Sequence, residues 1–442
     1  MEMKKSLLSI SLAVLISAPQ AFGADLISLY REAVEADPAI AAAKASAAAA
    51  RERVTLAQSA NGLTASMTAG SALNAVGFNQ RSPNFNSERI YLNATVSAQA
   101  SYPLRRTGIE VNIEQADAAV KLAEIGVEAA RQDVILRLAQ AYFDVLLAQD
   151  ALALVGAQKA AVSEQLAQAK RNFEVGTATI VDTNEAQARF DQVLAQEVAA
   201  QNDLETKRWA LRSVVGRYET NLKGLRPGVN PDAPNPTNMD AWVSQADNKG
   251  FAVRLAQQQV AVSQWEIERN KRTNDWTLDL VSSAGMSLAS GSAGNNANQT
   301  GRNGAIGVQF AKPLFTNGAT DSRIREALAN VEKLRNDIET ARRAAAQSTR
   351  AAYLGVVSGI SGVQAQQQAL KSAEVVLAST RLGLEVGVRT NLDVLNAQQS
   401  IFAVRRDLAS ARYNAIVNTL RLKAATGTLD EPDVVSANAY LQ

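Results

Sequence analysis

The sequence predicts a mainly α-helical chain with a membrane β-barrel part, built from duplicated long coiled-coil helical hairpins and two β-hairpins in each protomer. Three observations predict this fold. A sequence repeat divides the chain into two similar halves, and each half contains long segments of helical period. Each half also contains a segment in which apolar and polar residues alternate with a period of two.

The first residues predict a secretory signal peptide over residues 1–23. Lys4 and Lys5 precede an apolar run, and residues 21–23 provide small side chains at the two positions that a signal peptidase reads. No later stretch approaches the ~20 uninterrupted apolar residues that a membrane-spanning helix needs. We therefore expect the mature chain to leave the cytoplasm without a transmembrane helix.

The composition argues against an enzyme. The 442 residues include no His and no Cys, which excludes the common zinc sites, a Ser-His-Asp triad, a thiolate nucleophile, disulfides and a lipid-anchored N-terminal cysteine. We expect no metal site and no cofactor. The 45 basic residues nearly balance the 43 acidic ones, so the basic footprint of a nucleic-acid-binding protein is missing. Aromatic residues make up only 5%, which favours long helices packed through small side chains.

The internal repeat is the most informative feature of the chain. Residues 174–187 align with residues 385–398, with seven identities in fourteen positions at a shift of 211 residues (385 − 174). The same shift holds without a gap at several positions outside this window. The sequence therefore predicts two repeats, over residues 24–216 and 251–427.

Each repeat contains two long helical segments. Seven positions in the second repeat alternate steps of three and four, as in the heptad seam of a coiled coil: Val394, Ala397, Ile401, Val404, Leu408, Ala411 and Ala415. The equivalent positions of the first repeat are Thr183, Ala186, Phe190, Val193, Glu197, Ala200 and Leu204. Only Glu197 plainly departs from the pattern, because it is a charged residue at a seam position. The preceding segments, 108–173 and 318–384, are also predicted helices, with Gly156 as a weak point in the first. A helix of about 66 residues is roughly 100 Å long, enough to cross a periplasm.

A repeated turn separates the two helices of each hairpin, over residues 174–182 and 385–393. Gly176 and Gly387 tolerate the chain reversal, and Asp182 and Asp393 are candidate caps of the helices that follow. On spacing alone, a capped helical hairpin without any further function explains these residues equally well.

Two β-hairpins are predicted before the long helices, over residues 61–104 and 275–316. In the strongest strand, from Leu92 to Leu104, apolar and small polar residues alternate as in an outer-membrane barrel strand. Its counterpart lies around residues 306–314. The first strand of each hairpin has a weaker pattern. Connecting loops are expected over residues 73–88 and 289–304, which are rich in Asn, Gly and Ser.

Two soluble hairpins are the alternative to membrane strands. The signal peptide argues for the membrane, as do Tyr102, Trp276 and Phe315 near the strand ends, where aromatic girdles belong. Four strands cannot close a membrane barrel, since the smallest such barrels have about eight strands. An open sheet edge in lipid would leave hydrogen-bonding groups without partners. Several copies must therefore share one barrel, and this argument leaves their number open.

The chain resembles the TolC family of outer-membrane efflux and secretion proteins. The resemblance rests on the tip motifs EVGTATIVD and EVGVRTNLDVLNA, the two strand insertions, the duplication and the ending AATGTLDEPDV. It implies a homotrimer in the outer membrane of a Gram-negative bacterium, with a 12-strand β-barrel and a 12-helix periplasmic tunnel. An equatorial belt would come from segments 217–250 and 428–442. A linker between independent domains is the alternative for segment 217–250.

The resemblance also implies a function and partners. The chain would be the passive exit duct of a tripartite efflux pump, of a type I secretion system, or of both. It would meet a periplasmic adaptor (a membrane fusion protein), an inner-membrane RND or ABC transporter, and outer-membrane lipid. The alternative is a soluble periplasmic coiled-coil adaptor, although adaptors usually have only one hairpin. The sequence does not identify the cargo.

The family motifs carry over to the two tips. Asp393 matches an aspartate of the ring that closes the periplasmic end, Arg389 matches an arginine that bonds to the neighbouring hairpin, and Asp182 resembles its partner. Two positions depart from the family pattern: Asn396 replaces the second ring aspartate, and Leu384 replaces an aromatic residue. We expect a less acidic, differently latched gate. The expected adaptor-docking residues are Val175, Gly176, Thr177, Val386, Gly387 and Val388.

Overall fold

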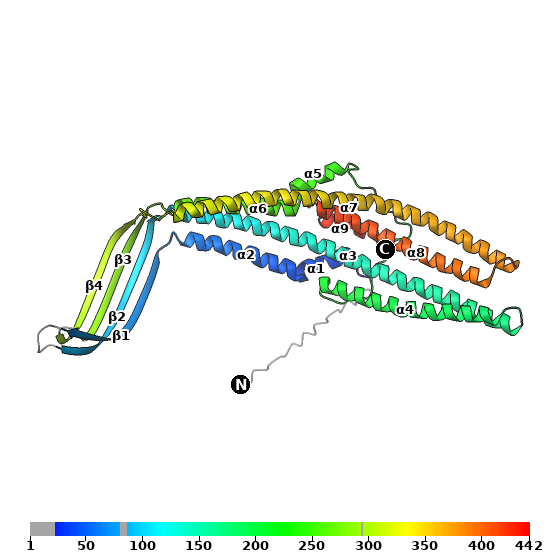
Figure 1. Ribbon diagram of the computed structural model, residues 1–442, viewed down its shortest axis with the longest axis horizontal. Coiled ribbons are helices and arrows are strands. Elements are labelled where there is room, and N and C mark those ends of the chain that lie inside the picture. The colour runs from blue at the N-terminus through cyan, green and yellow to red at the C-terminus, as the bar shows by residue number, and fades with distance from the viewer. Residues whose placement is uncertain (1–22, 80–85, 293–294) are drawn as a thin grey trace, which may run out of the picture.

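The computed structural model describes residues 23–79, 86–292 and 295–442. Nearly all of the predicted signal peptide lies outside the described residues. Long helices run side by side along one axis, and a curved sheet extends from one end of them (Figure 1). The far end of the helices carries the two predicted turns.

Both repeats have the same order of elements. The first repeat consists of α1 (Leu26–Ala36), α2 (Pro38–Ser59), β1 (Thr64–Asn79), β2 (Asn86–Arg105), α3 (Thr107–Glu174) and α4 (Ile180–Val215). The second consists of α5 (Met239–Lys249), α6 (Phe251–Arg272), β3 (Thr277–Ser292), β4 (Asn295–Ala311), α7 (Ala319–Glu385) and α8 (Asn391–Ala425), and α9 (Glu431–Asn438) follows it. The predicted long helices 108–173 and 318–384 are confirmed to within one residue at each end.

The helices that precede each β-hairpin were not predicted. The start of α2 carries a clear local signal, because Pro38 occupies the first helical turn and the Asp37 carboxylate accepts hydrogen bonds from the N–H groups of Ala39 and Ile40. A proline after a capping aspartate is a usual way to begin a helix. The helix α2 packs along the sheet-proximal part of α3, and α4 packs along its distal part (Figure 1).

The long helix α3 forms the centre of the main hydrophobic core. Tyr142, Phe143 and Leu146 are almost completely buried, together with residues of α1, α4 and α8. An 18-residue window of α3 has a mean hydropathy of 1.3, which is high enough for a membrane span, but 44% of it is buried inside the protein. A single window of this kind is weak evidence for a membrane span, because core helices can have the same hydropathy.

Five of the seven predicted seam positions in α8 and three of the seven in α4 are buried, and the others are partly buried. In α8, Val394, Ile401 and Leu408 are buried against α7, and in α4, Ala186 and Val193 are buried against α3. The unexpected Glu197 forms an ion pair of 2.7 Å with Lys159 of α3. A charge at this seam position is thus accommodated by a partner on the facing helix.

The described strands form one antiparallel sheet in the order β1-β2-β3-β4. The pairing of β2 with β3 joins the two repeats, so the repeats share one sheet. Most of the predicted loops 73–88 and 289–304 is wrong, because β1 and β2 pair as far as Asn79 and Asn86, and β3 and β4 pair as far as Ser292 and Asn295. Residues 80–85 and 293–294 of these loops lie outside the described residues. Asn, Gly and Ser suggested loops, but backbone hydrogen bonds between paired strands do not require apolar side chains.

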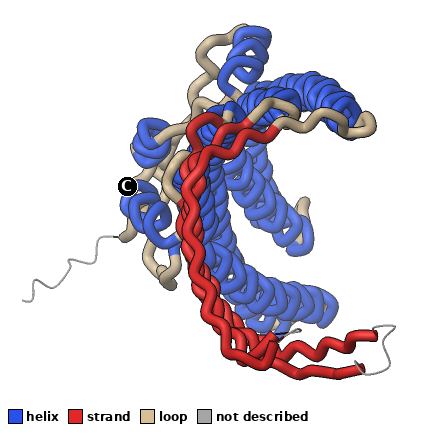
Figure 2. The backbone as a smooth tube through the Cα atoms, turned by 90° about the vertical axis from the view of Figure 1, so that its left-hand side faces the viewer, coloured by secondary structure: helices blue, strands red, loops and turns tan. Residues whose placement is uncertain are grey.

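The register places most of the large apolar residues of the strands on one face, with Val281 as an exception. Val96 of β2 lies opposite Ala69 of β1 and Met286 of β3, and Leu280 of β3 lies opposite Val308 of β4. The other face carries small polar residues. The sheet is strongly curved (Figure 2), and a hollow of about 650 Å³ beside it is lined by polar-face residues that include Gln99, Ser101 and Ser283. This is the two-sided pattern of a barrel wall.

Segments 217–250 and 428–442 pack against the helices near the middle of their length. Tyr142 of α3 donates a hydrogen bond to the carbonyl of Lys223 at 2.8 Å, and Leu225 pairs with Leu441 in an antiparallel bridge. The Trp242 indole N–H of α5 donates to the carbonyl of Pro236 at 2.7 Å. Tyr142 thus anchors segment 217–250 to the helical body, and segment 428–442 is anchored through Asn438, which accepts from the Leu26 N–H at 3.0 Å. A free interdomain linker would lack such contacts.

Candidate functional site

The two tips have nearly the same backbone. Gly176 and Gly387 follow α3 and α7 with φ values of 76° and 80°, the left-handed conformation that glycine adopts at low cost. The N–H of Thr177 donates to the carbonyl of Asn172 at 2.8 Å, and that of Val388 donates to Gly383 at 2.9 Å. These bonds satisfy the last carbonyls of each long helix, so both turns have a defined shape.

Thr179 and Thr390 are the N-caps of α4 and α8, and Asp182 and Asp393 are their reciprocal partners. The prediction that the aspartates are the caps is therefore corrected: they occupy the third helical position of a capping box. The Asp393 carboxylate accepts from the Thr390 N–H at 2.9 Å, and the Asp393 N–H donates to the Thr390 hydroxyl at 3.2 Å. This capping box lowers the pKa of Asp393, chiefly through the Thr390 backbone bond. The pKa of Asp182 is also lowered, first by its bond to the Thr179 hydroxyl.

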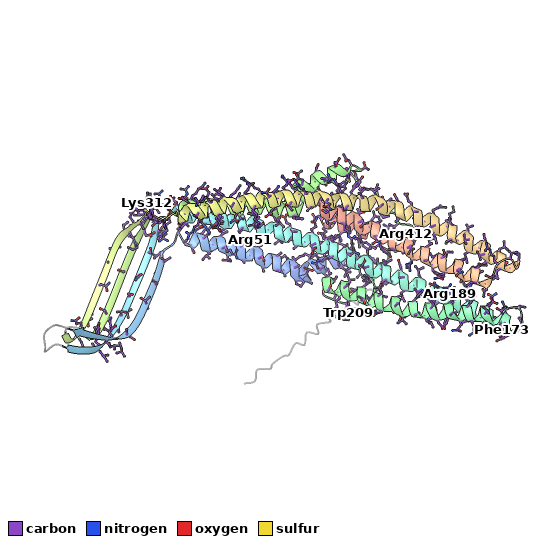
Figure 3. The ribbon with its side chains drawn as sticks, in the orientation of Figure 1. Arg51, Phe173, Arg189, Trp209, Lys312 and Arg412 are labelled. Carbon is purple, nitrogen blue, oxygen red and sulfur yellow. The ribbon has the colours of Figure 1, made fainter. Side chains whose placement is uncertain are left out.

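The tips expose the residues expected to dock an adaptor. The side chains of Val175, Val386 and Val388 are 73%, 65% and 75% exposed. A Cβ at Gly176 or Gly387 would meet no atom within 4 Å. Figure 3 shows Phe173 close to the end of the first tip, and it is half-exposed as well. Both tips therefore present apolar side chains beside an open stretch of backbone.

Arg389 lies against the end of its own hairpin. Its backbone N–H donates to the Gly383 carbonyl at 3.0 Å, and a Cβ at Gly383 would approach the Arg389 Cγ to 2.6 Å. The buried Gly383 was not predicted, although it makes this close packing possible. Arg389 also contributes to the lowered pKa of Asp393. Within the described part of this single chain, Arg389 and Asp182 form no ion pair. Their predicted contact joins neighbouring hairpins, so it stays a proposal.

Asn396 joins the two hairpins of the chain. Its side-chain oxygen, on α8, accepts a hydrogen bond of 3.1 Å from Arg189 Nη2 on α4. Arg189 also donates to Gln192 at 3.1 Å, which holds the guanidinium in place. Arg189 was not predicted. The sequence could have drawn attention to Arg189, because the two repeats differ there: the equivalent position in the second repeat is Ser400. The other departure from the family pattern, Leu384, is half-buried in the last turn of α7.

The comparisons agree with this architecture. A family model described as "Outer membrane efflux protein" matches residues 29–217 and 242–428, one match in each repeat. The chain belongs to this family. It is 33% identical to outer membrane protein TolC of Vibrio cholerae, over 100% of this chain and 99% of that protein. It is also 30% identical to the alkaline protease secretion protein AprF of Pseudomonas aeruginosa, over 96% of this chain and 89% of that protein.

Solved outer-membrane channels have the same fold. The CmeC channel of Campylobacter jejuni superposes with a TM-score of 0.76 at 14% identity, covering 100% of this chain and 98% of that chain. VceC of Vibrio cholerae superposes with a TM-score of 0.73 at 18% identity, covering 91% and 96%. The chain is thus a TolC-like outer-membrane protein, and the resemblance seen in its tip motifs is confirmed. Membership of this family argues against the soluble adaptor.

Proposed function

We propose that the protein is the outer-membrane exit duct of an efflux or type I secretion system. One observation carries this function: a sheet with one predominantly apolar face is joined to two helical hairpins, whose longest helices have 68 and 67 residues. A helix of this length spans about 100 Å. The sheet provides the membrane part, and the helices extend the conduit into the periplasm.

The duct is a homotrimer with a shared barrel. In the described chain, β1 and β4 are the edges of the sheet, and each pairs on one side only. Open edges cannot remain in lipid, because their backbone groups would lack hydrogen-bond partners. Three copies provide twelve strands and two provide eight, and the trimer agrees with the family resemblance. Light scattering of the detergent-solubilised protein should give about three times the mass of one chain. A stable folded monomer or dimer would rule out the twelve-strand barrel.

The duct works with a periplasmic adaptor and an inner-membrane transporter. Some relatives are named for efflux and others for protease secretion. This range supports a common conduit whose cargo is selected elsewhere, and it favours no single cargo. The adaptor docks at the exposed tip residues Val175 to Thr177 and Val386 to Val388.

The tips also form the gate. Three copies of Asp393 would place a ring of carboxylates at the narrow end, and acidic rings favour cations. Arg389 would latch one hairpin to the next through Asp182, and Asn396 would hold α8 to α4 through Arg189. Leu384 would leave the latch without the aromatic contact that the family resemblance implies.

The function is tested by export. In a bacterium that lacks its own exit duct, the full chain should restore efflux of a fluorescent dye or secretion of a type I substrate. The purified protein should also form channels in planar bilayers. Failure of both the export and the bilayer assay, with protein present in the outer-membrane fraction, would overturn the proposal.

A further inference from the structure

The apolar face of the sheet ends in a group of aromatic and basic side chains where the strands meet the helices. Figure 3 labels Lys312 at this corner. The group, called here the corner cluster, consists of Tyr102, Arg105, Trp276, Phe310, Lys312 and Phe315. Tyr102, Phe310 and Phe315 are 43%, 62% and 86% exposed, so the cluster lies open to the surroundings of the sheet.

A break in the strand register brings Arg105 to the apolar face. Regular alternation from Tyr102 would place residue 105 on the polar face with Pro103. Instead, the register shifts between Pro103 and Arg105, and Arg105 lies opposite Leu278, whose partner on β4 is Phe310. Bulges of this kind re-aim side chains.

The next residue, Arg106, is used differently. It binds Asp279 in a bidentate ion pair, with both N–H···O distances at 2.8 Å. Asp279 is buried, at 8% exposure. The two consecutive arginines therefore have separate roles: Arg106 fixes the junction between strand and helix, whereas Arg105 remains on the surface.

Trp276 holds the Arg105 guanidinium from one side. The Arg105 Cζ atom lies 3.8 Å from the Trp276 ring centroid, and the Trp276 and Phe310 rings are 5.7 Å apart. Stacking on an aromatic face leaves the in-plane N–H groups of a guanidinium free for other acceptors. Among the described residues, no carboxylate lies within ion-pair distance of Arg105. The Asp275 carboxylate attracts the Arg105 guanidinium electrostatically without a hydrogen bond to it. That carboxylate already accepts from Thr107 at 2.6 Å and from Arg272 at 3.3 Å.

In the proposed barrel, the corner cluster would lie at the level of the lipid headgroups. The apolar face, with Leu280 and Val308, ends at this level, and charged helices begin beyond it. Aromatic girdles mark the membrane–water interface of barrels. The two parallel N–H bonds of a guanidinium match two oxygens of a phosphate. We infer that Arg105, stacked on Trp276, binds the phosphate of a phospholipid in the periplasmic leaflet of the outer membrane.

Native mass spectrometry of detergent-solubilised oligomers with added phosphatidylglycerol tests this site. Arg105→Gln should lower the bound phospholipid roughly fivefold, the factor expected for one membrane-surface arginine. Arg302→Gln is the matched control. Arg302 lies on the same face of the sheet, opposite Met286 and near the other end of the strands, so it is remote from Trp276. Its variant should bind as much phospholipid as the wild type. Equal binding by the wild type and Arg105→Gln, or equal losses in both variants, would overturn the site.

Further binding measurements separate recognition of the phosphate from nonspecific lipid binding. An uncharged glycolipid without phosphate should bind equally to the wild type and Arg105→Gln, and inorganic phosphate should not displace the phospholipid. Trp276→Leu should give an intermediate loss, because the charge stays but the stacked ring is removed. Full retention in Trp276→Leu would overturn the role of the ring. If Arg105→Gln does not assemble, Arg105→Lys replaces it. That variant keeps the charge but loses the bidentate geometry, and it should bind less phospholipid than the wild type.

Discussion

Arg189 on α4 donates a hydrogen bond of 3.1 Å to Asn396 on α8, although 207 residues separate them in the chain. This bond crosses from one helical hairpin to the other close to the tips. Otherwise α4 and α8 make few contacts with each other, because each packs mainly on the long helix of its own hairpin. The pair is thus well placed to resist separation of the hairpins.

Arg189→Ala is expected to open the duct. A hydrogen bond to a charged donor contributes about 1.5–3 kcal/mol when well buried, and less at this exposed site. Planar-bilayer recordings should show a higher conductance or open probability. Gln187→Ala is the matched control, because Gln187 bonds to Asp191 within α4 and joins no hairpins. Asn396→Ala should resemble Arg189→Ala, and the double variant should add little. Wild-type conductance in Arg189→Ala would exclude this latch.

Arg389 and Asp393 should have separable effects on ion flow. Arg389→Ser removes the proposed contact with Asp182 of a neighbouring hairpin, an exposed pair worth up to ~1 kcal/mol, and should raise conductance. Asp393→Asn removes the ring charge but keeps an oxygen that accepts from the Thr390 N–H. It should reduce cation preference while changing conductance less than Arg389→Ser does. Reversal potentials in a salt gradient measure the preference. The gate assignment fails if neither variant differs from the wild type.

Charged residues at the tips should block adaptor docking. Val175→Glu with Val388→Glu places carboxylates on two exposed apolar positions without altering the turn glycines. Replacing Gly176 or Gly387 would be less informative, because any other residue is strained at these positive φ values. Export should stop while oligomers still assemble, and crosslinking to the adaptor should be lost. Val435→Glu, on exposed α9 at mid-length, is the control and should export normally. Normal export by the tip variant would refute the docking site.

The junction between sheet and helices depends on Arg106 and Asp279. Asp279→Asn leaves Arg106 without its ionic partner and should lower stability by about 1–3 kcal/mol per chain. The temperature at which oligomers dissociate on electrophoresis should fall. Arg272→Gln is the control, because its pair with Asp275 is longer and more exposed, at 3.3 Å. The double variant Arg106→Gln/Asp279→Asn should lose less than the sum of the single losses. Additive losses would show that the two side chains act independently.

The two capping boxes predict how the tips respond to acid. The pKa values of Asp182 and Asp393 lie below the ordinary 3.8, because the folded state favours their charged forms. Their contribution to stability is therefore fully present above pH 3.8 and is lost as the pH falls through the lowered values. The protection of the Thr179 and Thr390 N–H groups against hydrogen exchange, measured relative to the intrinsic exchange rate at each pH, should stay constant from neutral pH to this point and fall below it. The double variant Asp182→Asn/Asp393→Asn should not show this loss of protection. A loss of protection in the wild type at mildly acidic pH would contradict the assignment.

Much of the architecture was readable from the sequence because it depends on local patterns. The heptad seam from Val394 to Ala415 predicted a buried stripe, and Gly176 and Gly387 marked the two turns. The alternation after Leu92 predicted a two-faced strand. Each of these features reports the period of a helix or strand, which neighbouring residues specify by themselves.

The sequence by itself therefore determined the repeats, the long helices, the tips and the two-faced strands. Only the tertiary structure decided how far the strands pair, where the register shifts beside Arg105, and which side chain meets Asn396. The Asn, Gly and Ser residues of segment 73–88 predicted a loop, but a partner strand supplied hydrogen bonds to the backbone of residues 73–79. Contacts such as Arg189 with Asn396 form between residues far apart in the chain, so no local period encodes them. They depend on how the two hairpins come together in space.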